Sequence, residues 1–139
     1  MRESQMNAST RRLVWQRAEH RCEYCRLHQD HEPYYRFHIE HIIAKQHGGK
    51  ADPNNLALAC HHCNHHKGTN LSGIGRRTGS VVQLFHPRRQ KWQRHFRLVR
   101  ARVVGRTKCG RATVKLLDMN MRDRVELRKP LLAEGLLDG

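Results

Sequence analysis

Two Cys-x-x-Cys pairs, Cys22 with Cys25 and Cys60 with Cys63, place the tightest constraint on how this chain can fold. Four thiols paired at this spacing are typical of a tetrahedral structural zinc site. In a reducing cytoplasm the same pattern favours metal ligation over disulfide bonds. The 34 residues between the pairs exceed the roughly 15 to 20 of a compact zinc site. We therefore expect the intervening segment to form a strand pair that zinc ties to the upstream turn.

Length and composition set the scale of the fold. With 139 residues the chain fits one domain over 1–139, whose modest core needs the support of a structural metal. Hydrophobic residues make up 37%, and no apolar run approaches the roughly 20 residues that span a bilayer. Residues 1–10 lack the apolar segment of a secretory signal. We therefore expect a soluble, cytoplasmic protein with no membrane partner.

The distribution of charge indicates a polyanionic partner. Lys and Arg number 27 against 12 Asp and Glu, and no carboxylate occurs between Asp52 and Asp118, a stretch with fourteen Lys or Arg and six His residues. Such a surface attracts nucleic acid, because each neutralised phosphate releases counterions. A merely solvated basic surface, or an RNA-associated protein without chemistry, would have the same composition. The candidate phosphate contacts are Lys67, Arg88, Arg89, Lys91, Arg94 and Arg111.

Local patterns in the first half of the chain predict two helices and two strands, each bounded by a capping or turn residue. They are a helix over 11–19 capped by Ser9 or Thr10, a strand over 34–43 that breaks near His41, a strand over 56–59, and a helix from Cys60 to about Lys67 that Gly68 ends. Strand, loop, strand and helix would together form the catalytic unit.

The second half has weaker patterns, which predict a small β-strand and helix extension. The expected elements are a loop over 69–79, a strand over 81–85, one or two strands between Trp92 and Gly105, one amphipathic helix from Gly110 stopped by Pro130, and a loosely held tail over 131–139. The fold class is therefore α+β, with a catalytic core over 20–68 and an extension over 80–130.

Between the cysteine pairs, a carboxylate and an imidazole stand side by side at the predicted strand end. Phosphodiester hydrolysis needs a nucleophilic water and a group that stabilises the developing charge. A neutral imidazole accepts a proton near pH 7, so His41 is the candidate general base. The oxygens of Glu40 and Asn64 would hold one divalent metal. His65 or His66 is the reserve candidate for a third metal contact.

Glu40-His41, Asn55-Leu56 and Cys60-x-x-Cys63-Asn64-x-x-Lys67 resemble the motif of the HNH endonuclease family, in its ββα-metal (His-Me finger) form with a four-cysteine zinc knuckle. The resemblance implies that His41 is the general base, that Glu40 and Asn64 bind the catalytic metal, and that Asn55 braces the loop bearing His41. Glu40 stands where Asp is frequent, and Asn64 stands where the family name calls for His. Such oxygen ligands favour magnesium or manganese.

The resemblance further implies an enzyme, a metal-dependent DNA endonuclease that leaves a 5′-phosphate and a 3′-hydroxyl. Its partner would be duplex DNA, nicked one strand at a time by a monomer or weak dimer. A non-catalytic, zinc-stabilised nucleic-acid-binding module is the competing hypothesis, and it predicts salt-sensitive binding without cleavage. A structural zinc protein whose basic face binds an RNA scaffold is the third, and preference for RNA over duplex DNA would support it.

Overall fold

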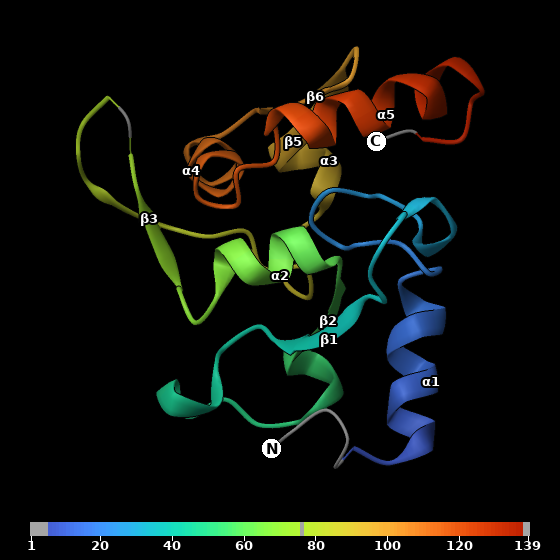
Figure 1. Cartoon of the computed structure of the whole chain (residues 1–139). Coiled ribbons are helices and arrows are strands. Elements are labelled where there is room, and N and C mark those ends of the chain that lie inside the picture. Colours follow the sequence, from blue (N-terminus) through green and yellow to red (C-terminus); the bar gives the residue numbers. More distant parts are fainter. Residues whose placement is uncertain (1–5, 76, 138–139) are drawn as a thin grey trace.

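The computed structural model describes residues 6–75 and 77–137 and shows an α+β fold of short helices and two-stranded antiparallel sheets (Figure 1). The helices are α1 (Ala8–Arg17), α2 (His61–Lys67), α3 (Trp92–His95), α4 (Lys108–Leu116) and α5 (Arg122–Ala133). The strands pair as β1 (His38–His41) with β2 (Leu56–Ala59), β3 (Ser72–Ile74) with β4 (Val81–Gln83), and β5 (Phe96–Val99) with β6 (Arg102–Gly105). No helix in the described part of the chain is long and apolar enough to cross a bilayer.

Helix α1 begins earlier than the sequence predicts. Its N-cap is Asn7, whose side chain accepts a hydrogen bond from the Thr10 backbone N–H at 2.8 Å, so the predicted caps at Ser9 and Thr10 are wrong. The helix ends at Arg17, whose guanidinium donates to the carbonyl oxygen of Leu56 at 2.7 Å. This bond fixes the end of α1 against the start of β2.

The central hairpin pairs β1 with β2 in antiparallel register, with His41 opposite Leu56. Strand β2 has the predicted bounds, and all four of its residues are buried. Strand β1 ends at His41 as predicted but is shorter than the strand expected over 34–43. The reason lies before the strand, where the Phe37 backbone N–H donates to the Gln29 side chain at 2.7 Å instead of to a neighbouring strand.

Helix α2 follows β2 directly and has the predicted bounds. Cys60 is its N-cap, because the Cys60 sulfur accepts a hydrogen bond from the Cys63 backbone N–H at 3.4 Å. Gly68 ends the helix in a conformation with φ of 53°, which glycine adopts at little cost. Because α2 contacts β1, the consecutive elements β1, β2 and α2 form one packed unit.

Two elements of the second half contradict the sequence prediction. Strand β3 lies in the stretch 69–79 that was expected to be a loop, and the single-turn helix α3 lies where a strand was expected. Strand β3 is too short to show alternation, and it packs on α4, where a Cβ added at Gly73 would lie only 3.5 Å from the Cβ of Ala112. One or two strands were expected up to Gly105, and the structure has two, β5 and β6.

The single amphipathic helix predicted from Gly110 to Pro130 is wrong, because the chain forms α4 and α5 with a turn between them. In that turn Asp118 has φ of 47°, and the Asn120 side chain exchanges two hydrogen bonds of 2.8 Å with the backbone of Val103. Contacts to β6 therefore break the helical pattern. Pro130 lies inside α5 and does not stop it.

The predicted loose tail is also wrong in its described part, since Leu131 and Leu137 are buried in the core. One hydrophobic cluster contains these leucines together with Phe85, Trp92 and the four paired cysteines. In Figure 1, α2 lies between the β1–β2 hairpin and the C-terminal elements α3, α4 and α5. The extension therefore packs on the unit that carries the candidate site.

Candidate active site and metal centre

The four paired cysteines meet at the interface between the turn at 22–25 and the N-terminus of α2. Their ligand sulfurs all lie within 4.8 Å of one another, and all four residues are buried. The sulfurs of Cys25 and Cys60, which come from the two different pairs, are 3.8 Å apart. This four-thiol cluster is positioned to bind a metal ion, as the sequence spacing predicts.

The surroundings of the four-thiol cluster suit thiolates. Backbone N–H groups of Tyr24 and Cys25 donate to the Cys22 sulfur at 3.4 Å, and such bonds favour the charged form. Hydrogen bonds with Cys22 and Cys25 raise the pKa of Cys60 and Cys63 well above the usual value, and a bound cation would favour their ionised form. Four sulfur ligands are the set of a closed, structural zinc site.

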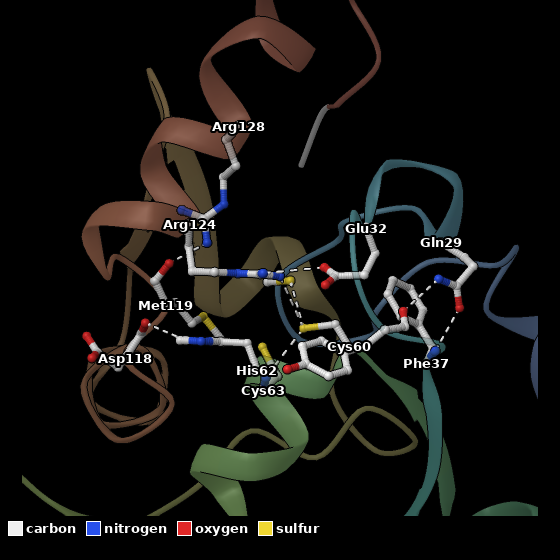
Figure 2. Close-up of polar contacts among 12 residues, drawn as sticks. Gln29, Glu32, Phe37, Cys60, His62, Cys63, Asp118, Met119, Arg124 and Arg128 are labelled. Atoms are coloured by element: carbon white, nitrogen blue, oxygen red, sulfur yellow. Dashed lines mark hydrogen bonds and ion pairs between the residues drawn. The ribbon is translucent and has the colours of Figure 1, made fainter.

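A side chain from the C-terminal extension reaches the four-thiol cluster (Figure 2). Arg124 of α5 is buried, with Nη2 at 3.7 Å from the Cys60 sulfur and Nη1 at 3.4 Å from the Glu32 carboxylate. Burial lowers the pKa of Arg124, but the charges of Cys25, Cys60 and Glu32 outweigh it and raise the pKa above its usual value. Sequence reasoning missed Arg124, which nothing in the local sequence distinguishes from the exposed Arg122.

Glu40 is buried in β1, and both of its carboxylate oxygens have partners. The Tyr24 hydroxyl donates to Oε1, while Lys67 Nζ lies 3.3 Å from Oε2 and donates to the Ile42 carbonyl oxygen at 3.0 Å. Burial raises the pKa of Glu40, although Lys67 and Tyr24 oppose the shift. Sequence reasoning missed both partners. Tyr24 could have been identified from the sequence, because it lies between Cys22 and Cys25 in a turn that a metal ion would hold in place.

His41 ends β1 and lies between the core and the surface, because it is only partly buried. Its Nε2 is buried and has no hydrogen-bond partner among the described residues. Burial lowers the pKa of His41 below the usual value of 6.5, which favours the neutral imidazole. A neutral ring with an unpaired nitrogen can accept a proton.

Asn55 holds the loop that follows His41. Its Nδ2 donates to the carbonyl oxygens of Ile43 and Lys50 at 3.0 and 2.9 Å, and its Oδ1 accepts from the Ile43 N–H at 2.8 Å. A Cβ at Gly49 would lie 1.7 Å from the Ile43 oxygen and 2.8 Å from Asn55 Nδ2, so only glycine fits there. The loop therefore closes back on Asn55, which fixes the backbone next to His41.

Asn64 lies on α2 one helical turn before Lys67 and is partly buried. In the described part of the chain its side-chain amide has no hydrogen bond that would occupy the oxygen. Residues three apart share a helix face, so Asn64 lies on the face that brings Lys67 to Glu40. Glu40 and Asn64 therefore come from two elements in contact, β1 and α2.

Residues 22–70, which contain all of these groups except Arg124 and the extension, match the family model described as HNH endonuclease. This segment, which we call the HNH segment, is similar to the HNH endonuclease family. The family indicates nuclease activity and a nucleic acid substrate. No curated protein and no solved structure matches the chain.

Two of the predicted phosphate contacts lie inside the protein. Lys67 of the HNH segment has only 3% of its side chain exposed and is paired with Glu40, so it does not present its charge to a ligand. Arg88 is largely buried and paired with Glu23, and burial together with Arg17 lowers the pKa of Arg88 to about 10. The exposed members of the predicted set are Arg89, Lys91, Arg94 and Arg111.

Four further histidines of the HNH segment lie on α2. The exposed His65 ring lies parallel to that of His61, with the centroids 6.1 Å apart. The His66 ring packs 4.3 Å from that of His62, whose Nε2 lies 2.8 Å from the Asp118 carbonyl oxygen. The rings of His61 and His65 therefore face each other, and His62 connects α2 to the C-terminal extension.

Proposed function

We propose that this protein is a metal-dependent DNA endonuclease with a ββα-metal (His-Me finger) site in which His41 is the general base. The proposal depends most on His41, whose buried Nε2 has no partner among the described residues at the end of β1. A base that stays neutral near pH 7 can take a proton from the attacking water. Asn55 acts through the backbone, because its three hydrogen bonds hold the loop after His41.

Glu40 and Asn64 are the proposed oxygen ligands of one divalent cation, magnesium or manganese. Tyr24 and Lys67 orient the Glu40 carboxylate, and each engages one of its oxygens. An ionised carboxylate has about four lone-pair sites, so two hydrogen-bonding partners leave capacity for a ligand role. When bound, the cation supplies Lewis-acid stabilisation of the phosphate and the leaving oxygen.

Duplex DNA is the proposed substrate, and the products would carry a 5′-phosphate and a 3′-hydroxyl. The stretch between Asp52 and Asp118 has no carboxylate, and it includes the exposed Arg89, Lys91 and Arg111. Such groups attract the phosphate backbone without selecting a sequence. One chain has one His41, so a monomer or weak dimer would nick one strand in each event.

Zinc is the proposed occupant of the four-thiol cluster, where it has a structural role. The ion would join the turn at 22–25 to the N-terminus of α2 and so hold Tyr24 over Glu40. The Trp92 indole N–H donates to the Tyr24 carbonyl oxygen at 2.7 Å and supports the same turn from the extension. The metal centre therefore positions the candidate active site without taking part in its chemistry.

A plasmid-nicking assay with magnesium or manganese tests the proposed function. The wild-type protein should convert supercoiled DNA to open circles, and His41→Ala should lower the rate by about 10²- to 10⁴-fold, the usual contribution of a general base. His47→Ala is the matched control, because His47 is exposed in the loop that follows β1. Absence of metal-dependent nicking by the wild type, or full activity of His41→Ala, would refute the assignment.

A non-catalytic, zinc-stabilised nucleic-acid-binding module is the second candidate function. The buried ion pair between Lys67 and Glu40 favours it, since the ammonium already neutralises the carboxylate expected to bind a cation. This candidate predicts DNA binding that weakens steeply with salt and no metal-stimulated cleavage. Binding and cleavage assays on the same preparation separate the two functions.

A further inference from the structure

We propose that the C-terminal extension is part of the metal centre, and that Arg124 holds the metal ion in place by balancing the charge of the thiolates. The inference rests on zinc occupancy of the four-thiol cluster, as proposed above, and does not depend on nuclease activity. It assigns a role to the extension, which lies outside the family match over residues 22–70. Arg124 is a positioning residue here, because it touches a metal ligand and not the metal.

Geometry brings the Arg124 guanidinium to the edge of the four-thiol cluster. Nη2 lies 3.7 Å from the Cys60 sulfur, and Nη1 lies 3.4 Å from the Glu32 carboxylate, so one planar group bridges two anions. Figure 2 shows Arg124 extended between Glu32 and Cys60, with Arg128 above it on the same helix. A guanidinium fork can make both contacts at once, which an ammonium on a single nitrogen cannot do as well.

The charge balance explains why a cationic side chain is needed beside the four-thiol cluster. Four thiolates with one divalent ion would carry a net charge of two negative units in a buried site, and Glu32 would add another. Burying such charge is unfavourable unless it is paired. Arg124 and Arg128 lie four residues apart on one face of α5, and both are buried.

The extension is held so that Arg124 cannot easily withdraw. In the turn before α5, His62 of α2 contacts the Asp118 carbonyl oxygen at 2.8 Å, and Met119 is fully buried. Arg128 donates to the backbone carbonyls of Met119 and Ala101, the latter at 3.0 Å. These contacts fix α5 against α2, the helix that Cys60 caps. Arg124 therefore approaches the sulfur of Cys60, which caps the N-terminus of α2.

The extension also contacts the other half of the metal centre. Trp92 donates to the backbone of Tyr24, and Arg88 pairs with Glu23, so both residues inside the turn 22–25 are held from the C-terminal half. A separation of the two cysteine pairs would open the zinc site. The extension opposes that separation on both sides, and of these contacts only that of Arg124 acts directly on a ligand sulfur.

Zinc release from the full-length protein tests the inference. Zinc content and the rate of zinc transfer to a chelating dye are measured for the wild type, Arg124→Gln, Arg124→Lys and the control Arg122→Gln, which removes an exposed charge from the same helix. Arg124→Gln should release zinc about 10- to 100-fold faster, the usual effect of losing a partner of a metal ligand. Arg124→Lys, which keeps the charge but not the fork, should fall between, and Arg122→Gln should match the wild type.

Cobalt substitution gives a readout that a general loss of stability would not move. In the folded protein, the sulfur-to-cobalt absorption should shift in Arg124→Gln because a positive charge beside the Cys60 sulfur is lost, and Arg124→Lys should restore most of the wild-type band. Release rates and spectra of the Arg124 variants equal to those of Arg122→Gln would overturn the inference. Wild-type protein purified without zinc would overturn zinc occupancy as well, whereas a lack of DNA cleavage would leave these measurements intact.

Discussion

The four-thiol cluster and the His41 site lie in the same HNH segment but differ in how completely their polar atoms are paired. All four sulfur residues are buried, and hydrogen bonds reach the sulfurs of Cys22 and Cys60 from the backbone. His41 is partly exposed, and its Nε2 has no partner among the described residues. A closed set of ligands holds structure, whereas an unpaired nitrogen on a partly exposed ring leaves capacity for a reactant. Substitutions at the four-thiol cluster should therefore mainly lower stability, and substitutions at the His41 site should mainly lower activity.

The largest effect is expected on removing one thiol, in Cys63→Ser. Structural zinc contributes about 10–16 kcal/mol in zinc-finger peptides, comparable with the about 5–15 kcal/mol that keeps a domain folded. The variant should lose zinc and cooperative thermal unfolding, as followed by circular dichroism. Cys109→Ser is the control, because the fifth cysteine lies outside the four-thiol cluster. An unfolding transition of Cys63→Ser like that of the wild type would show that the cluster does not hold the fold together.

Asn55→Ala should affect both stability and activity, because Asn55 connects the fold to the His41 site. Losing its hydrogen bonds leaves backbone groups of Ile43 and Lys50 unpaired, at about 1–3 kcal/mol for each group that stays buried. A small displacement of His41 can lower the rate about 10²-fold. Thermal unfolding and nicking rates measure the two effects. If the rate stays as high as that of the exposed control Asn54→Ala, Asn55 serves the fold alone.

The pH dependence of cleavage should report His41 directly. Burial lowers its pKa below 6.5, so the neutral base is present above that pKa and is lost as the pH falls through it. A divalent cation nearby would shift the pKa in the same direction. The acidic limb of kcat/KM should therefore have its midpoint below pH 6.5, and the residual activity of His41→Ala should lack that limb. A midpoint above pH 6.5 would contradict a base held neutral by burial.

The smallest effect is expected at the DNA surface. Arg111 is exposed, so Arg111→Gln should weaken DNA binding and reduce the slope of log affinity against log salt by about 0.9 for one lost phosphate contact. Arg88→Gln should leave that slope unchanged but lower stability, because Arg88 pairs with the buried Glu23. Fluorescence anisotropy at several salt concentrations measures the slopes. Equal slopes for wild type and Arg111→Gln would remove Arg111 from the binding surface.

Elements bounded by local signals could be predicted, and elements shaped by distant contacts could not. Cys60 and Gly68 act within one helical turn, so the bounds of α2 follow from the sequence. The break between α4 and α5 depends on Asn120, whose side chain forms hydrogen bonds with the backbone of Val103 in the β5–β6 hairpin. The apolar spacing around this break continues as in one helix, and periodicity alone therefore misses it.

The candidate site shows the same division. The motif identifies Glu40, His41, Asn55 and Asn64 by type and order, but it does not show that Tyr24 and Lys67 occupy both oxygens of Glu40. Lys67 was predicted to contact phosphate because a basic residue in an acid-free stretch usually faces solvent. The packing of α2 on β1 turns its ammonium inward instead.

The sequence by itself determined the ligand chemistry of this protein: four thiols in two pairs, a histidine after a carboxylate, and amides at fixed places, all within residues 22–70. These are properties of residue type and short spacing. Only the tertiary structure decided which long cationic side chains meet which anions. Arg124 meets Cys60 across 64 residues of chain and Arg88 meets Glu23 across 65, and side chains this long can reach many partners until the fold selects one.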